Sequence, residues 1–255
     1  MNLSQINPIW RMRVERILDK LVGMRLRYLI NSPRLSSGVL HRQALRAVGA
    51  GADGRGAVMF DVGAHVGETA LALALEFPEA AIHAFEPVEA IFRRLERNCR
   101  NYPNVICHHA ALGARNETRI IALRSNEVSC GMNQMGRLAG ENTPAELRER
   151  VTIQRLDDVC HQFSVRQIAF LKIDVEGFEL EVLRGASEML KLRKIQTVIA
   201  EAAFSNTDEQ HAHFDDVRGM LEPFGFVLAG YYDPTYRPES GRLDFSNFLF
   251  TLGEE

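Results

Sequence analysis

The chain has 255 residues, of which 46% are hydrophobic and 25% charged, and its formal net charge is −3. This near-average composition excludes a disordered or fibrous chain and suffices for one globular domain with a full central sheet. The charge is uneven, because about nine Arg or Lys but only two acids fall within the first 46 residues. The remaining body is therefore acidic, which disfavours a nucleic-acid binder.

Cysteine usage and apolar segments bear on location. The four cysteines form no Cys-x-x-Cys pair, which favours reduced thiols. No apolar run reaches the ~18 residues that span a bilayer, and no signal-peptide pattern is present. We expect a cytoplasmic protein.

The first 50 residues predict an extension to a main domain over residues 51–255. Apolar residues recur at helical spacing over residues 6–30, with basic residues between them, which predicts an amphipathic basic helix. Such a helix can lie on anionic lipid as a peripheral membrane contact, or it can cover the domain or a partner in a homodimer. Both alternatives remain open at this stage.

The most informative stretch runs from Val58 to Glu76. It predicts a short apolar strand, a turn marked by two glycines and an Ala- and Leu-rich helix from Ala70. The helix N-terminus leaves free N–H groups facing the turn, so a ligand can lie directly against the backbone. The candidate ligand contacts in this turn are Asp61, Val62, Gly63, Ala64, His65 and Gly67.

The details of the turn indicate which ligand it takes. Neither the G-x-G-x-x-G dinucleotide fingerprint nor a Gly-Lys-Ser/Thr phosphate loop is present. Asp61, two residues before the first glycine, would repel a pyrophosphate but suits a cationic amino-acid ligand. We therefore expect S-adenosylmethionine, whose methionine end carries an ammonium and a sulfonium.

The next strands extend this interpretation. Residues 81–85 predict a strand that ends at Glu86, about twenty residues after the turn, where a carboxylate can bind ribose hydroxyls. Pro87 then opens a helix over residues 88–100. A third strand over residues 105–110 is followed by small residues that leave room for an adenine ring, so Ala110 and Ala111 are contact candidates, although ordinary turn chemistry explains them equally well.

A second informative stretch is the strand over residues 168–173. Lys172 and Asp174 share one face of it, and a buried lysine needs an acidic partner, for which Asp61 on the neighbouring strand is suitable. Asp174 and Glu176 lie at the carboxyl end, where ligand crevices form in open α/β sheets. The next strand, over residues 195–200, ends in Glu201.

The rest of the chain completes an alternating α/β pattern. Residues 124–142 have no sustained period and predict a mobile substrate lid. A helix is expected over residues 208–223, and metal binding by His211 and His213 is disfavoured because two residues on a helix point ~200° apart. Two closing strands, over residues 225–232 and 244–252, flank a loop that can touch substrate. The pattern predicts a doubly wound, mostly parallel sheet.

The segments FDVGAHVGETA, AFEP, LDDV and LKIDVEGFELEVLRGA, in this order over residues 57–250, resemble the FkbM family of S-adenosylmethionine-dependent methyltransferases. The resemblance implies a Rossmann-like class I methyltransferase sheet of seven strands with the last one antiparallel. It also implies O-methylation of a sugar, glycan, glycolipid or polyketide-like small molecule. One departure is His65, which stands where the family usually has Asn.

Methyl transfer to a hydroxyl requires alignment and a base. The candidate bases are Asp174, Glu176 and Glu201, although Asp174 can instead bind the cofactor's ammonium. Mg²⁺ held by these carboxylates is a minority alternative without a complete ligand set, so no metal ligand is assigned. The rival functions are an N-methyltransferase of nucleic acid or protein, which lacks its Asn/Asp-Pro-Pro-Tyr/Phe motif here, and a catalytically silent cofactor-binding scaffold.

Overall fold

The computed structural model describes residues 54–122, 148–205, 208, 210–237 and 240–253. All of them belong to one compact unit, His41–Glu255. The expected N-terminal extension over residues 1–50, the lid over residues 124–142 and Cys130 lie outside the described residues. Within the described residues, no helix combines the length and the apolar character needed to cross a bilayer.

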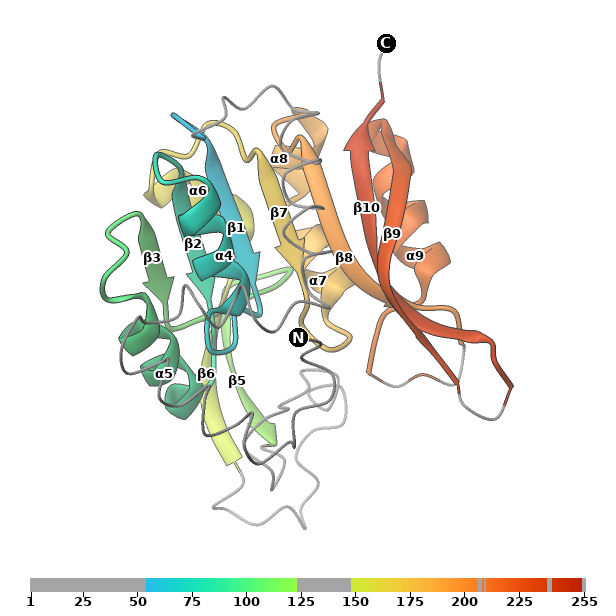
Figure 1. Cartoon of the computed structure of the whole chain (residues 1–255), viewed down its shortest axis with the longest axis horizontal. Coiled ribbons are helices and arrows are strands. Elements are labelled where there is room, and N and C mark those ends of the chain that lie inside the picture. Colours follow the sequence, from blue (N-terminus) through green and yellow to red (C-terminus); the bar gives the residue numbers. More distant parts are fainter. Residues whose placement is uncertain (1–53, 123–147, 206–207, 209, 238–239, 254–255) are drawn as a thin grey trace, which may run out of the picture. The chain divides into compact units, whose positions relative to one another are not determined.

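The core of the described unit is one seven-stranded sheet (Figure 1). Its strands, in spatial order, are β3 (Val105–His108), β2 (Ala81–Phe85), β1 (Val58–Val62), β7 (Phe170–Ile173), β8 (Thr197–Ala203), β10 (Leu243–Leu252) and β9 (Phe226–Tyr236). The first five run parallel, whereas β10 runs antiparallel to both of its neighbours. The expected doubly wound sheet with an antiparallel last strand is confirmed.

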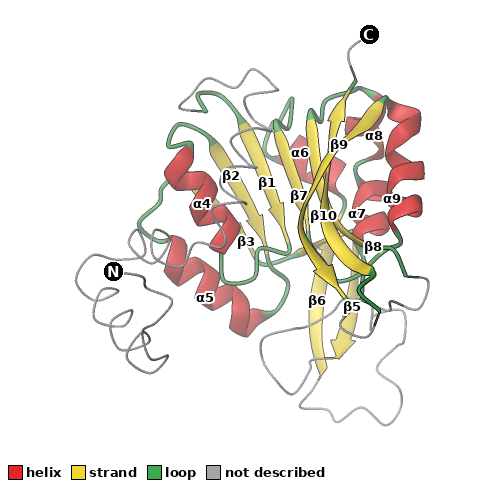
Figure 2. Cartoon of the chain, turned by 45° about the vertical axis from the view of Figure 1, so that its right-hand side comes forward, coloured by secondary structure: helices red, strands yellow, loops and turns green. Residues whose placement is uncertain are grey.

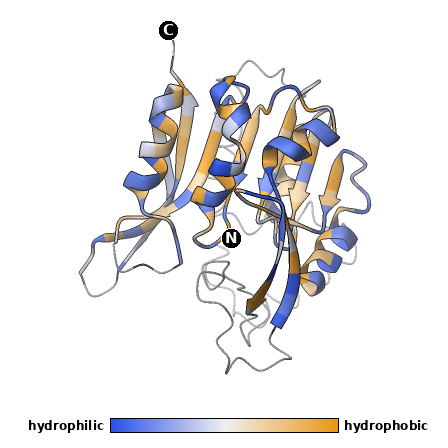
Figure 3. Ribbon diagram, turned by 180° about the vertical axis from the view of Figure 1, so that it is seen from behind, coloured by the Kyte–Doolittle hydropathy of each residue, from blue (hydrophilic) through white to orange (hydrophobic). Residues whose placement is uncertain are grey.

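Helices cover both faces of this sheet (Figure 2). On one side lie α4 (Glu68–Glu76) and α5 (Glu89–Cys99); on the other lie α6 (Leu156–Gln162), α7 (Glu179–Gly185), α8 (Ser187–Lys191) and α9 (Phe214–Leu221), which the short 3-10 helix η4 (Glu222–Phe224) extends. The central strands are the most hydrophobic part of the ribbon (Figure 3). Their aromatic side chains, such as Phe60 and Phe85, are fully buried against α6 to α9, which supplies the main hydrophobic stabilisation.

A second, three-stranded sheet joins this body, with the order β4 (Ala111–Leu112), β6 (Arg148–Gln154) and β5 (Glu117–Ala122). The junction is very close, because a Cβ added to Gly185 at the end of α7 would lie 2.1 Å from the carbonyl oxygen of Gly113. The hairpin of β5 and β6 also reaches α5, where the Glu149 carboxylate accepts a hydrogen bond from the Glu89 N–H at 2.6 Å. This contact satisfies one of the free donors at the start of α5.

Element boundaries differ from the sequence predictions where long-range pairing decides them. Asp61 lies inside β1 and Glu201 inside β8, rather than after the strand ends. Pairing with β10 extends β8 to Ala203. Strand β9 continues to Tyr236 and β10 begins at Leu243, so the substrate loop predicted between them is shorter than expected.

The helix predicted over residues 208–223 is wrong at its start, because α9 begins only at Phe214. The Asp208 carboxylate accepts hydrogen bonds from the N–H groups of Gln210 and His211, which folds a local turn in place of a helical one. His213 is the N-cap of α9 and accepts a hydrogen bond from the Asp215 N–H. The helical-spacing argument against a chelating pair therefore does not apply to these histidines.

Candidate active site

A cavity of about 290 Å³ opens at the carboxyl ends of β1, β2 and β7. The turn after β1 forms one wall, and the N–H groups of Gly63 and Ala64 are anchored to the Phe85 carbonyl at 3.1 and 2.9 Å. Gly63 has φ +80°, and a Cβ there would lie 1.8 Å from the Asp174 carbonyl oxygen. Only glycine allows the two strand ends to approach so closely.

Glu86 follows β2 directly and is 5% exposed. Its carboxylate accepts the His65 N–H at 3.0 Å through Oε2 and the Val88 N–H at 2.9 Å through Oε1. Burial raises the pKa of Glu86 to about 7, although these two N–H groups oppose the shift. Each oxygen keeps a further lone pair, so the carboxylate can also accept from hydroxyl groups of a ligand in the cavity.

The backbone conformation of His65 accounts for a histidine at this position in place of the Asn of the resembling family. Its backbone has φ +50°, in the left-handed region that disfavours most side chains but tolerates Asn and His. The contact of His65 with Glu86 is made by its backbone N–H, not by its side chain. A change from Asn to His therefore preserves this backbone contact.

The far wall of the cavity is apolar. Four apolar side chains contribute to the lining there: Phe85, Ile91, Ala111 and Leu112. Together with Glu86, they provide the mixture of apolar surface and a few polar groups that is typical of nucleoside sites. The sequence predicted Ala111 but missed the other three, because β2, α5 and β4 contribute them through packing.

Lys172 links the strands at the centre of the sheet. Its ammonium lies 2.8 Å from Asp174 Oδ2 and 4.0 Å from Asp61 Oδ1. Burial works to lower the pKa of Lys172, but Asp174 and Asp61 raise it above its ordinary value. The predicted acidic partner Asp61 is confirmed, with Asp174 as the nearer one. Asp61 is fully buried, and burial raises the pKa of its carboxyl to about 6.

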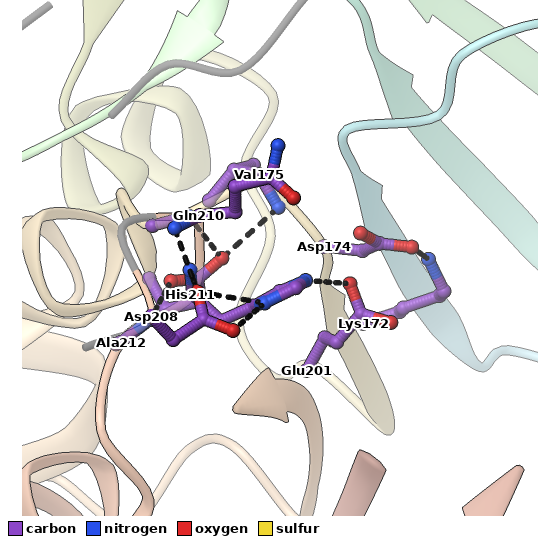
Figure 4. A network of polar contacts seen from close by, with 10 residues as sticks. Lys172, Asp174, Val175, Glu201, Asp208, Gln210, His211 and Ala212 are labelled. Atoms are coloured by element: carbon purple, nitrogen blue, oxygen red, sulfur yellow. Dashed lines mark hydrogen bonds and ion pairs between the residues drawn. The ribbon is translucent and has the colours of Figure 1, made fainter. Parts of the chain in front are cut away.

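Asp174 connects the cavity to a second group of polar side chains (Figure 4). Its carboxyl interacts with that of Glu201, whose Oε2 lies 3.2 Å from His211 Nε2. Burial would raise the pKa of Asp174, but Lys172 holds it below its usual range. Burial raises the pKa of Glu201, although contact with His211 opposes this shift. The two carboxyls are therefore tuned in opposite directions, as in a paired acid and base.

Glu176 and the turn around it are held by a buried carboxyl on α7. Glu176 has φ +49°, a costly conformation for a non-glycine residue that is often found at functional sites. The Glu179 carboxyl is fully buried and accepts the Gly177 N–H at 2.9 Å and the Val175 N–H at 3.3 Å. Burial raises the pKa of Glu179 to about 7. This role of Glu179 was not predicted from the sequence, although a glutamate in the first helical turn after the strand end is a usable signal.

The structure brings most of the sequence-predicted site residues into one cavity. The members that line it are Val62, Gly63, Ala64, His65, Glu86, Pro87, Ala111, Asp174 and Glu176. Four candidates lie outside the lining: Asp61, Gly67, Ala110 and Glu201. Asp61 acts through Lys172, and Gly67 instead accommodates α5, because a Cβ there would lie 2.8 Å from Leu95 Cδ1. Among the described residues, no group of three or more His, Cys, Asp or Glu is arranged to hold a metal ion.

Comparisons with known proteins agree with this architecture. Residues 61–228 match the family model described as the methyltransferase FkbM domain. Methyltransferase 1 of Beauveria bassiana is 28% identical over 184 residues, covering 66% of this chain and 72% of that protein. The 31-O-demethyl-FK506 methyltransferase FkbM of Streptomyces tacrolimicus is 28% identical over 208 residues, covering 71% of this chain and 76% of that protein.

Among solved structures, a putative sarcosine dimethylglycine methyltransferase from Galdieria sulphuraria shares the fold. The TM-score is 0.50 at 12% identity, and the match covers 86% of each chain. At this identity the likeness concerns the fold alone. The family model covers well over half of the chain and includes both walls of the cavity. The chain therefore belongs to the FkbM methyltransferase domain family.

Proposed function

We propose that this methyltransferase transfers a methyl group from S-adenosylmethionine to a hydroxyl of a sugar, glycan, glycolipid or polyketide-like small molecule. The observation that carries the proposal is Glu86, a buried carboxylate at the end of β2 that faces a cavity of nucleoside character. A relative named as a 31-O-demethyl-FK506 methyltransferase supports an oxygen acceptor.

The residues present fit the cofactor. Glu86 would bind the ribose hydroxyls, the apolar wall of Phe85, Ile91 and Leu112 would enclose the adenine, and Asp174 would pair with the ammonium. Lys172 holds Asp174 ionised, which suits a cationic partner. S-adenosylmethionine supplies the activated methyl group when bound.

The protein has two tasks for the acceptor. It must align the hydroxyl with the methyl carbon, which can contribute ~7–11 kcal/mol, and accept the hydroxyl proton, which contributes ~10²–10⁴-fold. Asp174 and Glu176 lie in the cavity wall, whereas Glu201 lies outside the lining and interacts with Asp174. Of the three candidate bases, Asp174 and Glu176 are therefore the two that an acceptor in the cavity can reach, and an ionised Glu201 would raise the proton affinity of Asp174.

The decisive experiment is calorimetric titration with S-adenosylhomocysteine of the wild type, Glu86→Ala and the matched control Glu79→Ala. Glu79 is exposed near the opposite, amino end of β2. Losing hydrogen bonds to a charged group costs roughly 1.5–3 kcal/mol, which corresponds to about 10- to 150-fold weaker binding for Glu86→Ala. The control should bind as the wild type does.

Folded wild-type protein that does not bind S-adenosylhomocysteine would overturn the proposed cofactor. If it binds, radiolabelled S-adenosylmethionine is then incubated with matched panels of hydroxylated and amine-bearing acceptors. Labelling of the hydroxylated panel is expected. Labelling confined to amines would replace the oxygen acceptor with a nitrogen one, and cofactor binding without any labelling across both panels would favour a silent binding domain.

A further inference from the structure

His211 lies outside the cavity lining and contacts Glu201, the carboxyl that interacts with Asp174. The His211 side chain is 8% exposed, and its two ring nitrogens both face carboxylates: Nε2 lies 3.2 Å from Glu201 Oε2, and Nδ1 lies 3.1 Å from Asp208 Oδ2 (Figure 4). A ring can donate to two carboxylates at once only as an imidazolium. In accord with this, Glu201 and Asp208 outweigh burial and raise the pKa of His211 to about 9.

The position of this ring is fixed from several directions. The His211 N–H donates to Asp208 at 2.9 Å, and the ring stacks on Phe245 at 4.4 Å between centroids. The next N–H along the chain, of Ala212, donates to Glu179 at 3.0 Å. Because the same Glu179 carboxyl holds the turn of Glu176, the cavity wall and the histidine share one anchor.

The charges around Glu201 show why its ionisation depends on His211. Directly after β7, the Asp174 carboxylate disfavours a second negative charge on Glu201. Lys172 in β7 is hydrogen bonded to Asp174 and also interacts electrostatically with Glu201. From β10, the residue in register with Glu201 is Asn247, which carries no charge. Asp208 faces the far side of the imidazole. Among these neighbours, His211 is the cation in direct contact with Glu201.

We propose that His211 is a positioning residue that keeps Glu201 ionised beside Asp174. The second negative charge raises the proton affinity of Asp174, which lines the cavity, so that Asp174 can accept the proton of the methyl acceptor. This inference rests on the proposed function. The acceptor O–H bond breaks, its proton moves to an Asp174 carboxylate oxygen, and the oxygen electron pair forms the bond to the methyl carbon. The electron pair of the broken carbon–sulfur bond stays on sulfur, so no further reactant is needed.

The test measures the protonation of Glu201 directly. The full chain is labelled with glutamate carrying ¹³C at the side-chain carboxyl, and its spectrum is followed by NMR from pH 4 to 9 after assignment with Glu201→Gln. One neighbouring charge shifts a carboxyl pKa by about one to three pH units. Removing it in His211→Gln should therefore raise the Glu201 midpoint by about one unit or more.

His213→Gln is the matched control, because His213 lies two residues away, caps α9 and has Asp215 as its carboxylate neighbour, at 3.8 Å. It should leave the Glu201 midpoint unchanged. His211→Asn supplies a second variant if His211→Gln does not fold, because it also removes the cation and keeps an amide donor. A similar upward shift of the same midpoint is expected.

An unchanged Glu201 midpoint in a folded His211→Gln or His211→Asn protein would overturn the inference. S-adenosylhomocysteine binding is measured on the same samples. Wild-type protein that fails to bind would refute the proposed function and leave the titration result intact, whereas normal binding with an unmoved midpoint would refute the role of His211 alone.

Discussion

Different kinds of interaction hold the cavity wall next to Glu86 and the wall next to Asp174. Around Glu86, neighbouring N–H and carbonyl groups of the chain fix the geometry, and the contributing residues lie within about twenty-five positions of each other. Around Asp174, side-chain charges from β7, β8 and the segment before α9 meet across long sequence separations. Backbone geometry gives one wall a fixed shape, whereas interacting charges give the other an adjustable proton affinity.

The largest expected effect comes from breaking the backbone-built wall with Gly63→Ala. The added methyl group would lie 1.8 Å from a backbone oxygen, which cannot rotate away as a side chain can. We expect a loss of roughly 3–5 kcal/mol in the free energy of unfolding, measured by urea denaturation.

Gly56→Ala is the matched control for that change. Gly56 has a similar φ of +74°, but a Cβ there meets nothing within 4 Å. It should show only the left-handed backbone cost of about 1–2 kcal/mol. Equal losses for the two variants would mean that close approach of β1 and β7 is not what requires Gly63.

A smaller effect is expected from Glu179→Gln. This variant sharpens the comparison because the Glu179 carboxyl accepts N–H groups from the Glu176 turn and from the segment that carries His211. The amide nitrogen of Gln would face N–H donors that the carboxyl now accepts. One unsatisfied buried group costs about 1–3 kcal/mol, to be read from urea denaturation. The partly exposed Glu181→Gln on the same helix should cost less than about 1 kcal/mol. Similar losses for both would argue against a special anchoring role.

The smallest effect concerns the pH dependence of cofactor binding. The pKa values of Glu86 and Asp61 are raised to about 7 and about 6, so both carboxyls bind protons near neutrality in the free protein. A ligand with hydroxyl donors and an ammonium favours their ionised forms, so its affinity should rise severalfold as pH increases from about 6 to above 7. Calorimetry with S-adenosylhomocysteine at each pH measures this.

Glu86→Ala should flatten that rise, because one of the two competing protons is then absent. Proton release on binding, obtained by repeating the titration in buffers of different ionisation enthalpy, should fall in parallel. A wild-type affinity that does not change with pH across this range would show that neither carboxyl loses a proton when the ligand binds.

The backbone-built wall was predictable from sequence, since its glycines and strand ends are local signals. β2 was predicted with the bounds that the structure has, and the resemblance supplied the antiparallel β10. The charge-built wall was predictable only in part. Asp174, Glu176 and Glu201 were selected as residues at strand ends, but nothing in the sequence indicated that His211 would meet Glu201.

The reason lies in local competition between hydrogen bonds. Residues 208–223 have a helical pattern, and Asp208 appeared to begin that helix. Its carboxylate instead accepts the N–H groups of Gln210 and His211, so α9 begins only at Phe214. His211 therefore lies outside the helix, where it contacts Glu201 of β8. Hydrogen bonds from this one carboxylate outweigh the helical spacing of apolar residues. The result also depends on distant partners, because Glu179 accepts the Ala212 N–H and Glu201 contacts His211.

The junction of Gly113 with Gly185 limits how segments of related proteins can be exchanged. A side chain at Gly185 would collide with the carbonyl of Gly113, and one at Gly113 would lie 2.7 Å from Ile153. A chimera that takes α7 from one parent and β4 with β6 from another must therefore bring both glycines and a compatible Ile153 together. Crossover points placed between them would separate residues that have to be inherited as a unit.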